Sequence, residues 1–478
     1  MHTDEHIHIS TELIQTITPD QAWHYRIIPK EQHNGTLSFY VDDSKVSAAQ
    51  QQQELEIVLG KTVVLHSANA DVIQSALGKY YRRQQAAKSA QTLQLKASDD
   101  FLIQLILEAK QLGSSDIHIE IFEQKCRVRI RIDGHLIERY TLNKTDYPSL
   151  INKIKIKANL DISEKRLPQD GRIFFNHHGE KFDIRVSALP TLHGEKIVMR
   201  LLSNDATNID INYLGFTADE LAKYLEGIKK PHGIILISGP TGSGKTTTLY
   251  ATLKILNTDK VNITTIEDPI EYTLDGINQV QLKEDIGLTF ASALRTFLRQ
   301  DPDVIMLGEI RDGETAQMAI RAALTGHLVL STIHTNSAWG TINRLIDMGV
   351  PPFLLASTLN TSVAQRLVRL LCPECKQQQD VLDTMFPRTF TAPRKLQHHY
   401  GPVGCEHCYY TGYKGRKALY EIIPIDIELA ENIKNNNFNI APVLKEKKIQ
   451  TLKDNAFDLL EKGITSIDEV YPLLMNAI

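Results

Sequence analysis

The 478-residue sequence has no run of about 20 apolar residues, the length that a helix needs to cross a bilayer. It also has no large excess of either charge, because 53 lysines and arginines nearly balance 57 aspartates and glutamates, which leaves a net charge of −4. Such a balance gives no general attraction to phosphate backbones, so we expect no direct binding to nucleic acid. The N-terminal residues show neither a basic leader nor an apolar stretch, and we expect a cytoplasmic protein that reaches a membrane only through a partner.

Cysteine is scarce, and the sequence has no internal repeat and no long low-complexity tract. Four of the five cysteines form two Cys-x-x-Cys pairs, which in a reducing compartment favour a metal site over disulfides. Hydrophobic residues make up 42% of the chain and charged residues 23%, the composition of an ordinary globular protein. At about 150 residues per domain, the length predicts three or more domains.

Changes in composition divide the sequence into three predicted domains. Residues 1–85 hold short apolar runs and no catalytic motif, which indicates a small α/β adaptor domain, and residues 86–97 read as a linker. Residues 98–205 begin with a helical pattern and continue as strands with period-two alternation, which predicts an α+β domain. Residues 206–478 form the last predicted domain, with a cysteine-containing subdomain at 366–418 and a C-terminal helical part at 421–478.

The last domain contains four short runs with the pattern of a buried strand, which alternate with helical stretches, and the first of the four is almost wholly apolar. These runs lie at residues 233–238, 261–266, 304–307 and 328–332. Strands of this kind are buried on both faces, and helices between them act as crossovers. The pattern predicts an α/β domain with a mainly parallel sheet.

The first of the four runs leads into a loop that fits the phosphate-binding pattern G-x-x-x-x-G-K-[ST]. Its glycines let backbone N–H groups turn toward phosphates, Lys245 reaches the β and γ oxygens, and Thr246 helps to hold Mg²⁺. A purely structural turn is the alternative, but the strand before the loop and the helix after it give the context of a nucleotide site. The predicted nucleotide-binding residues are Gly239, Pro240, Thr241, Gly242, Ser243, Gly244, Lys245, Thr246 and Thr247.

Acidic residues follow the second and third runs. Glu267, Asp268 and Glu271 come at the end of the second run, where an open α/β sheet forms its ligand crevice. They are candidates for polarising the attacking water, and the alternative is a solvated acidic turn that Pro269 rigidifies. Glu309 follows the third run and is our main candidate for the acidic residue that helps to bind Mg²⁺.

Two histidines bracket the fourth run. His334, at its end, is placed to sense the γ-phosphate, and His327 is the weaker candidate. A hydrogen-bonded structural role is the alternative for each.

The two Cys-x-x-Cys pairs have the spacing of two knuckles that close a tetrahedral metal site. The predicted ligands of a structural Zn²⁺ are Cys372, Cys375, Cys405 and Cys408. Because no ligand position is left open, the metal fastens a subdomain whose sequence is too polar to build a core. Reduced thiols without a metal are the alternative.

Together these motifs resemble the secretion ATPase superfamily, which includes the type II secretion ATPases of the GspE family and the type IV pilus assembly and retraction ATPases. The resemblance covers residues 97–478 and includes Gly-Ser-Ser-Asp-Ile-His-Ile-Glu at 113–120, Arg-Leu-Pro-Gln-Asp-Gly-Arg at 166–172 and Gly-Glu-Lys-Ile-Val-Met-Arg at 194–200. It also includes the phosphate loop, an "Asp box" at 267–271, Gly-Glu-Ile-Arg-Asp at 308–312 and a "His box" that ends at His334. The resemblance implies a RecA-like ATPase domain preceded by a PAS-like α+β domain.

The resemblance also implies roles for residues that sequence physics alone leaves as surface or salt-bridged groups. Arg185 and Arg200 would reach the γ-phosphate across a subunit interface. Glu271 would activate the water while Glu309 attends to Mg²⁺, although other assignments reverse these two roles. The arginines that would line the same site or interface are Arg295, Arg299, Arg311 and Arg344.

The implied assembly is a homohexamer that hydrolyses ATP to extend a pseudopilus in type II secretion, attached peripherally to the inner membrane. Residues 1–85 would dock on the cytoplasmic domain of a bitopic inner-membrane protein, and the ring would face a polytopic platform protein. The cysteine loop and the single N-terminal domain favour this reading over a retraction ATPase. Type IV pilus assembly is the alternative with the same chemistry, and a zinc-stabilised nucleotide-binding scaffold without useful turnover is the alternative of another class.

Overall fold

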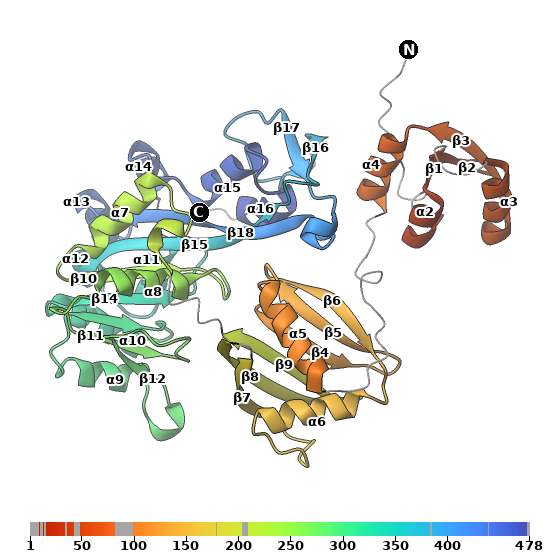
Figure 1. Ribbon diagram of the computed structural model, residues 1–478. Helices are drawn as coiled ribbons and strands as arrows, with labels where there is room; N and C mark the ends of the chain where they lie inside the picture. Colours follow the sequence, from red (N-terminus) through yellow and green to blue (C-terminus); the bar gives the residue numbers. More distant parts are fainter. Residues whose placement is uncertain are drawn as a thin grey trace. The chain divides into compact units, whose positions relative to one another are not determined.

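The computed structural model describes residues 9, 13, 16–33, 36–42, 48–81, 99–177, 179–202, 209–382, 385–437 and 439–475. The chain divides into two compact units, Met1–Gln91 and Thr92–Ile478 (Figure 1). The predicted linker at 86–97 lies outside the described residues. Within the described ranges, no helix combines the length and the apolar character that a membrane crossing requires.

The first unit is a small α/β fold with a three-stranded sheet. β1 (Ile27–His33) pairs antiparallel with β2 (Thr36–Asp42), which pairs parallel with β3 (Thr62–Ala68). The helices are α2 (Pro19–Tyr25), α3 (Ala48–Leu59) and α4 (Ala70–Tyr80). Thr18 caps α2 by accepting a hydrogen bond from the Gln21 backbone N–H at 3.2 Å. Ile27, Phe39 and Leu77 are fully buried in the core of this unit.

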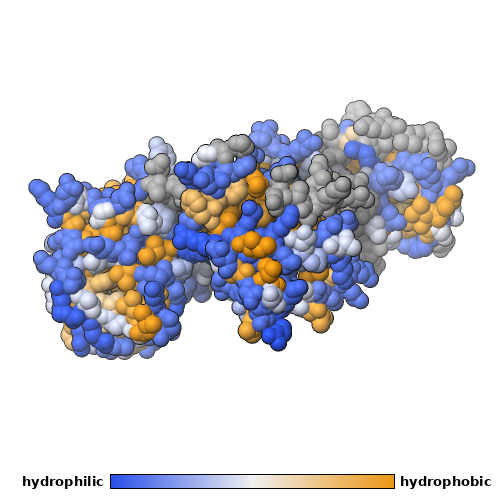
Figure 2. All heavy atoms as spheres, turned by 60° about the horizontal axis from the view of Figure 1, so that its bottom comes forward, coloured by the Kyte–Doolittle hydropathy of each residue, from blue (hydrophilic) through white to orange (hydrophobic). Residues whose placement is uncertain are grey.

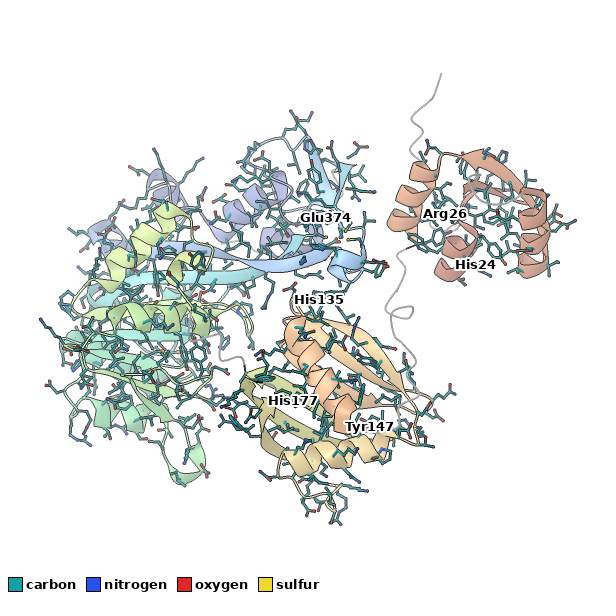
Figure 3. All side chains as sticks on the ribbon, viewed as in Figure 1. His24, Arg26, His135, Tyr147, His177 and Glu374 are labelled. Atoms are coloured by element: carbon teal, nitrogen blue, oxygen red, sulfur yellow. The ribbon has the colours of Figure 1, made fainter. Side chains whose placement is uncertain are left out.

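The second unit begins with a six-stranded antiparallel sheet in the order β6-β5-β4-β9-β8-β7. Its strands are β4 (Asp116–Ile121), β5 (Cys126–Ile132), β6 (His135–Leu142), β7 (Gln169–His177), β8 (Glu180–Thr191) and β9 (Gly194–Leu202). Helices α5 (Asp99–Gln111) and α6 (Tyr147–Lys157) share a hydrophobic core with one face of the sheet. Tyr147 fastens α6, because its buried hydroxyl lies 2.8 Å from the Glu195 carbonyl and 3.1 Å from the Ile119 carbonyl (Figure 3).

The other half of the second unit is built on a seven-stranded sheet in the order β12-β11-β13-β14-β10-β15-β18. Neighbouring strands are parallel from β12 to β15, as predicted, while β18 pairs antiparallel with β15. The strands are β10 (Gly233–Ser238), β11 (Ile263–Glu267), β12 (Asn278–Gln281), β13 (Val304–Leu307), β14 (Leu328–Ile333), β15 (Leu359–Leu371) and β18 (Tyr413–Pro424). The α/β fold class with a mainly parallel sheet is therefore confirmed.

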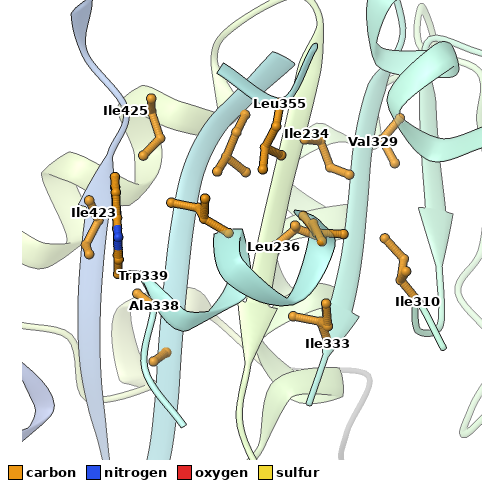
Figure 4. Packing of buried hydrophobic residues seen from close by; sticks show 14 of the residues in the cluster. Ile234, Leu236, Ile310, Val329, Ile333, Ala338, Trp339, Leu355, Ile423 and Ile425 are labelled. Atoms are coloured by element: carbon orange, nitrogen blue, oxygen red, sulfur yellow. The ribbon is translucent and has the colours of Figure 1, made fainter. Parts of the chain in front are cut away.

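Helices accompany this sheet along the whole segment. They are α7 (Ala218–Ile228), α8 (Lys245–Leu256), α9 (Phe290–Phe297), α10 (Gly313–Leu324), α11 (Gly340–Asp347), α12 (Pro352–Thr358), α13 (Ile427–Lys434), α14 (Ala441–Glu446), α15 (Leu452–Glu461) and α16 (Ile467–Met475), with single 3₁₀ turns at Ile211–Tyr213, Glu284–Ile286 and Glu406–Cys408. Ile234 and Leu236 of β10 pack with Val329 and Ile333 of β14 in the core, and Trp339 lies near Ile423 of β18 (Figure 4).

A separate hairpin, β16 (Gln377–Asp380) and β17 (His398–Gly401), lies between the two cysteine pairs. On the visible face of the molecule, apolar side chains form small patches among hydrophilic ones (Figure 2). The two larger sheets of the second unit, with six and seven strands, position the candidate site.

Candidate functional site

The order of the parallel strands brings the sequence motifs together. β11, β13, β14 and β10 are successive neighbours, and their pairing is in register up to Ile266 with Leu307, Leu307 with Ser331 and Ser238 with Ile333. Parallel strands end at the same edge of the sheet. The phosphate loop, the Asp box, Glu309 and His334 therefore follow four adjacent strand ends.

The phosphate loop joins β10 to α8 and holds its lysine inward. The Lys245 ammonium donates hydrogen bonds to the carbonyls of Gly239 at 2.8 Å and Pro240 at 3.0 Å. The pKa of Lys245 is lowered, mainly because the side chain is buried. Glu309 opposes this change, whereas Arg366 adds to it. Lysine in this place is a buried cation within reach of anionic ligands, as a phosphate site requires.

Two loop glycines have physical reasons to be glycine. Gly244 precedes α8 with φ = 87°, a left-handed conformation that other residues rarely adopt. At Gly239, a Cβ would lie 2.5 Å from the Gln365 carbonyl and 2.6 Å from the Ser243 hydroxyl. The loop therefore packs directly on β15, whose strand carries Gln365.

Glu309 is held by two partners after β13. Its Oε1 accepts a hydrogen bond from Arg311 Nε at 2.7 Å, and its Oε2 lies 3.2 Å from Nε2 of His334. Arg311 also donates to Asp268 at 3.1 Å. These contacts link the Asp box, the end of β13 and the His box in one charged network.

Glu267 has a different environment from the other acids. Only 3% of it is exposed, and its carboxylate accepts hydrogen bonds from Tyr250, from Thr265 at 2.6 Å and from Gln279 at 3.1 Å. Because both oxygens are already engaged, Glu267 lines the site mainly as a support for the turn that presents Asp268 and Glu271.

Glu271 and Arg185 form the link between the two sheets. Arg185 on β8 donates to the Ile270 carbonyl at 2.5 Å and lies 3.4 Å from the Glu271 carboxylate. The sequence resemblance placed Arg185 opposite a neighbouring subunit, whereas the structure brings it to the Asp box of its own chain. Arg200 on β9 donates from Nε to Asp116 at 3.0 Å.

A cavity of about 990 Å³ joins these elements, and its walls come from both of the larger sheets of the second unit. Residues 241–247 line it, together with Glu271, Glu309 and His334. Arg200 lines it from β9. The cavity thus collects the loop, both candidate acids and one of the two arginines expected at the γ-phosphate.

Sequence reasoning missed part of the cavity wall. Asp116 and His118 lie within the motif at 113–120 that carried the family resemblance, but no role was assigned to them. Arg131 and Arg416 had no recognisable motif, and Tyr272 follows the Asp box directly. Asp116, His118, Arg131 and Arg416 reach the cavity only through the pairing of β4 with β9 and the contact of the β5–β6 turn with β18, where Gly415 N–H donates to Asp133 at 2.7 Å.

Several predicted residues lie elsewhere in this structure. Among the described residues, the cavity lining does not include Arg295, Arg299, Arg311 or Arg344. Arg295 pairs with Glu314, and Arg299 donates to the Arg295 carbonyl at 2.9 Å. At the opposite end of β14 from His334, His327 Nδ1 lies 2.9 Å from the Ala322 carbonyl, a structural contact.

Oxygen ligands suited to Mg²⁺ are present beside the phosphate loop. Thr246 supplies a hydroxyl and Glu309 a carboxylate, the donor types that Mg²⁺ prefers. Since Arg311 and His334 already engage both Glu309 oxygens, direct binding to the metal would release one of these partners. The residues present fit a magnesium ion that also binds phosphate and water.

The four cysteines converge on one point. Their sulfurs all lie within 4.8 Å of one another, and Cys372–Cys405, Cys375–Cys408 and Cys405–Cys408 are each 3.8 Å apart. Four sulfurs at about 2.3 Å from a tetrahedral zinc would be about 3.8 Å apart, so the geometry fits Zn²⁺. The backbone N–H of Gly404 points to Cys375 Sγ at 3.3 Å, and that of Gly412 to Cys408 Sγ at 3.2 Å, as thiolate ligands favour.

Comparisons with known proteins agree with these features. Residues 91–472 match the family model "Type II/IV secretion system protein", and residues 3–87 match the MshEN domain. The chain is 48% identical over 368 residues to the type II secretion system ATPase E of Vibrio cholerae serotype O1, covering 76% of this chain and 72% of that protein. It is also 48% identical over 395 residues to the type IV pilus assembly ATPase PilB of Myxococcus xanthus, covering 78% and 68%.

A solved structure gives the same result at the level of fold. The crystal structure of the pilus retraction motor PilT with bound ADP superposes with a TM-score of 0.54 at 27% identity, covering 78% of this chain and 97% of that one. The family match extends over most of the chain, and the strand-end motifs occupy one cavity. The chain therefore belongs to the type II/IV secretion system protein family.

Proposed function

We propose that this protein hydrolyses ATP to ADP and phosphate and that the reaction powers protein export by type II secretion. The observation that carries the proposal is the single cavity that holds the phosphate loop, Glu271 and the Glu309–His334 pair. The similarity to the Vibrio cholerae protein supports the secretion assignment.

Phosphate binding falls to the loop and α8. Backbone N–H groups of the loop and the positive end of α8 attract the phosphates. Lys245 leaves the Gly239 and Pro240 carbonyls and takes phosphate oxygens as its partners instead. Mg²⁺, held through Thr246 and Glu309, would neutralise charge on the β and γ oxygens.

Water activation falls to Glu271, with Glu309 as the other candidate. Glu271 lines the cavity and keeps its backbone fixed, because its N–H donates to the Tyr250 hydroxyl at 3.3 Å. Arg185 and Arg200 supply positive charge to the γ-phosphoryl group while it is transferred to water and ADP leaves. His334, hydrogen-bonded to Glu309, reports the presence of that phosphate to the end of β14.

The working assembly in this proposal is a homohexamer at the cytoplasmic face of the inner membrane. Residues 1–85 would bind the cytoplasmic domain of a bitopic secretion protein, and the ring would act on a polytopic platform protein. The separate first unit supports the docking role, because its described residues form a small compact fold with its own core. Structural Zn²⁺ on the four cysteines completes the proposed set of cofactors.

The test has a biochemical and a cellular arm. The purified protein should release phosphate from ATP, and Glu271→Gln should reduce turnover while leaving ATP binding intact. Deleting the gene should stop release of folded proteins into the medium, and the wild-type gene, but not the Glu271→Gln gene, should restore it. Normal secretion in the deletion strain would overturn the secretion assignment.

Type IV pilus assembly is a second candidate, favoured by the equal identity to the Myxococcus xanthus protein. The same deletion strain separates the two. Loss of surface pili with unchanged protein export would select the pilus function, and loss of export with unchanged pili would select type II secretion.

A further inference from the structure

His118 lies at the centre of the charged face of the six-stranded sheet. β4 runs between β5 and β9, and its alternation puts Asp116, His118 and Glu120 on one face. In the ladder, His118 stands opposite Arg129 of β5 and Val198 of β9. The helices α5 and α6 cover the other face, so these three side chains face away from that core.

The two carboxylates beside His118 are occupied by other residues. Asp116 accepts hydrogen bonds from Arg200 at 3.0 Å and from Ser115 at 2.8 Å, with Arg131 at 3.3 Å. Glu120 accepts from Arg127 at 2.9 Å and from Arg129 at 2.8 Å, with Lys196 at 3.3 Å. Neither acid is engaged with the imidazole.

His118 itself is 9% exposed, and both of its ring nitrogens are buried without a hydrogen-bond partner. It lines the cavity that the phosphate loop also lines. Two other side chains of this cavity, Ser243 and Tyr272, likewise carry a buried hydroxyl without a partner. Because an unpaired buried polar group is costly, such a wall fits a polar ligand that supplies the missing partners.

The charged groups around His118 affect its protonation, and its protonation determines which ligand groups it can hydrogen-bond. Burial lowers the pKa of His118, as do Lys196 and Arg131, while Asp116 and Glu120 raise it, and the net direction is down. A neutral imidazole donates from one nitrogen and accepts at the other, which suits a hydroxyl or a base edge. Phosphate oxygens only accept and carry charge, so they suit lysine and arginine better.

We propose that His118 binds the nucleoside part of ATP, by hydrogen bonds to a sugar hydroxyl or to the edge of the base. The inference rests on the proposed nucleotide site and adds a contact from the sheet that faces the phosphate loop. In this proposal β4 contributes to nucleotide specificity through His118, in addition to the ion pairs of Asp116 and Glu120.

The experiment compares full-length wild type, His118→Ala and His118→Asn, with His193→Ala as the matched control because His193 is exposed in a turn of the same domain. Affinities for ATP, ADP, 2′-deoxy-ATP, 3′-deoxy-ATP and inosine triphosphate are measured by calorimetry. Loss of one hydrogen bond should weaken ATP and ADP alike by about three- to tenfold in His118→Ala. His118→Asn, which keeps a donor and an acceptor, should recover part of the loss.

The analogues identify the contacted group. Wild type should bind one of the analogues about three- to tenfold more weakly than ATP, and His118→Ala should bind that analogue and ATP equally. A deoxy analogue points to the sugar, and the inosine nucleotide to the base. These ratios do not depend on the fraction of folded variant.

Two results would overturn the inference. One is an unchanged preference among the analogues in His118→Ala, and the other is a loss of affinity for ATP but not for ADP, which would assign His118 to the γ-phosphate. Failure of the wild-type protein to bind any of these nucleotides would instead overturn the proposed function, so the two failures are distinguishable.

Discussion

The two larger sheets of the second unit present their charged residues in different ways. In the antiparallel sheet of residues 116–202, strands alternate between core and surface, and charged side chains stand along one face. In the parallel sheet, β10, β11, β13 and β14 are buried along their whole length, and the polar residues follow the strand ends. Arg185 connects the two arrangements by reaching from a strand face to the Asp box.

This difference teaches where each sheet is vulnerable. On the antiparallel sheet, charges neutralise one another, so removing one partner leaves a buried charge of the opposite sign. At the parallel strand ends, the residues line the cavity. In the proposed function they contact ATP, so we expect the removal of one to change activity more than stability. A third feature, the four-cysteine cluster, has the geometry of a metal site, and a bound metal would fix its segment in place of a sheet.

The largest effect should come from breaking that third feature. Cys372→Ser should reduce bound zinc from about one ion per chain to almost none and lower the free energy of unfolding of the C-terminal region by about 5 kcal/mol. Metal analysis and thermal unfolding measure the two effects. The control is Cys126→Ala, which removes the buried cysteine outside the cluster and should leave zinc binding unchanged. If wild-type protein purified without zinc were as stable as zinc-containing protein, the metal site would be refuted.

At the strand ends, Lys245→Ala should abolish activity without unfolding the protein. We expect turnover to fall by about 1000-fold, since the lysine is the main cation of the phosphate loop. Phosphate release and circular dichroism provide the measurements. Lys254→Ala, near the other end of α8, is the control and should remain active. Normal phosphate release by Lys245→Ala would contradict the proposal that ATP is hydrolysed at the phosphate loop.

On the antiparallel face, Glu120→Gln should cost stability. Burial alone would raise the pKa of Glu120, but hydrogen bonds from Arg129 and Arg127 lower it to about 2. Because the pKa of Glu120 is lower in the folded than in the unfolded protein, this carboxylate stabilises the fold above pH 4.5. The stabilisation, about 3 kcal/mol, is lost as the pH falls toward 2. Unfolding measured from pH 7 to pH 3 should show this slope in wild type and lose it in Glu120→Gln.

Glu164 provides the matched control for that titration. Hydrogen bonds from Arg166 lower its pKa to about 2 as well, yet Arg166 lies in solvent, where screening weakens the pair. Glu164→Gln should therefore leave stability almost unchanged. Equal losses of stability in the two variants would show that the buried ion pairs of Glu120 stabilise the protein no more than the exposed pair of Glu164.

The smallest effect should come from the link between the sheets. Arg185→Ala should lower turnover by about thirtyfold, since it removes the cation that contacts Glu271 but leaves the phosphate loop intact. Arg172→Ala is the control, because Arg172 lies on the same sheet face and pairs with Asp183 at 2.8 Å. Steady-state phosphate release measures both variants, and equal activities would remove Arg185 from the site.

Mixed assemblies test on which chain Arg185 acts. If a chain completes its own site, as the contact with Ile270 indicates, mixing Arg185→Ala with Lys245→Ala chains should restore no activity. Recovery in demonstrably mixed rings would show that a neighbouring subunit supplies the arginine, as the family resemblance implies.

Much of this protein followed from local pattern. The phosphate loop, the helix after it and the four buried strands were predictable because each signal lies within a few adjacent residues. The acids and His334 were predictable as strand-end residues for the same reason. The antiparallel edge was not foreseen, because the pairing of β15 with β18 joins segments on either side of the cysteine loop.

The sequence by itself determined the fold class, the phosphate loop and the four convergent cysteines, since spacing and periodicity are local properties. Only the tertiary structure decided that Arg185 meets Glu271 of its own chain and that Glu267 is a buried support. It also decided that His118 lines the same cavity as the phosphate loop with both ring nitrogens unpaired. These outcomes depend on strand register and on contacts between residues far apart in the chain, which no local pattern encodes.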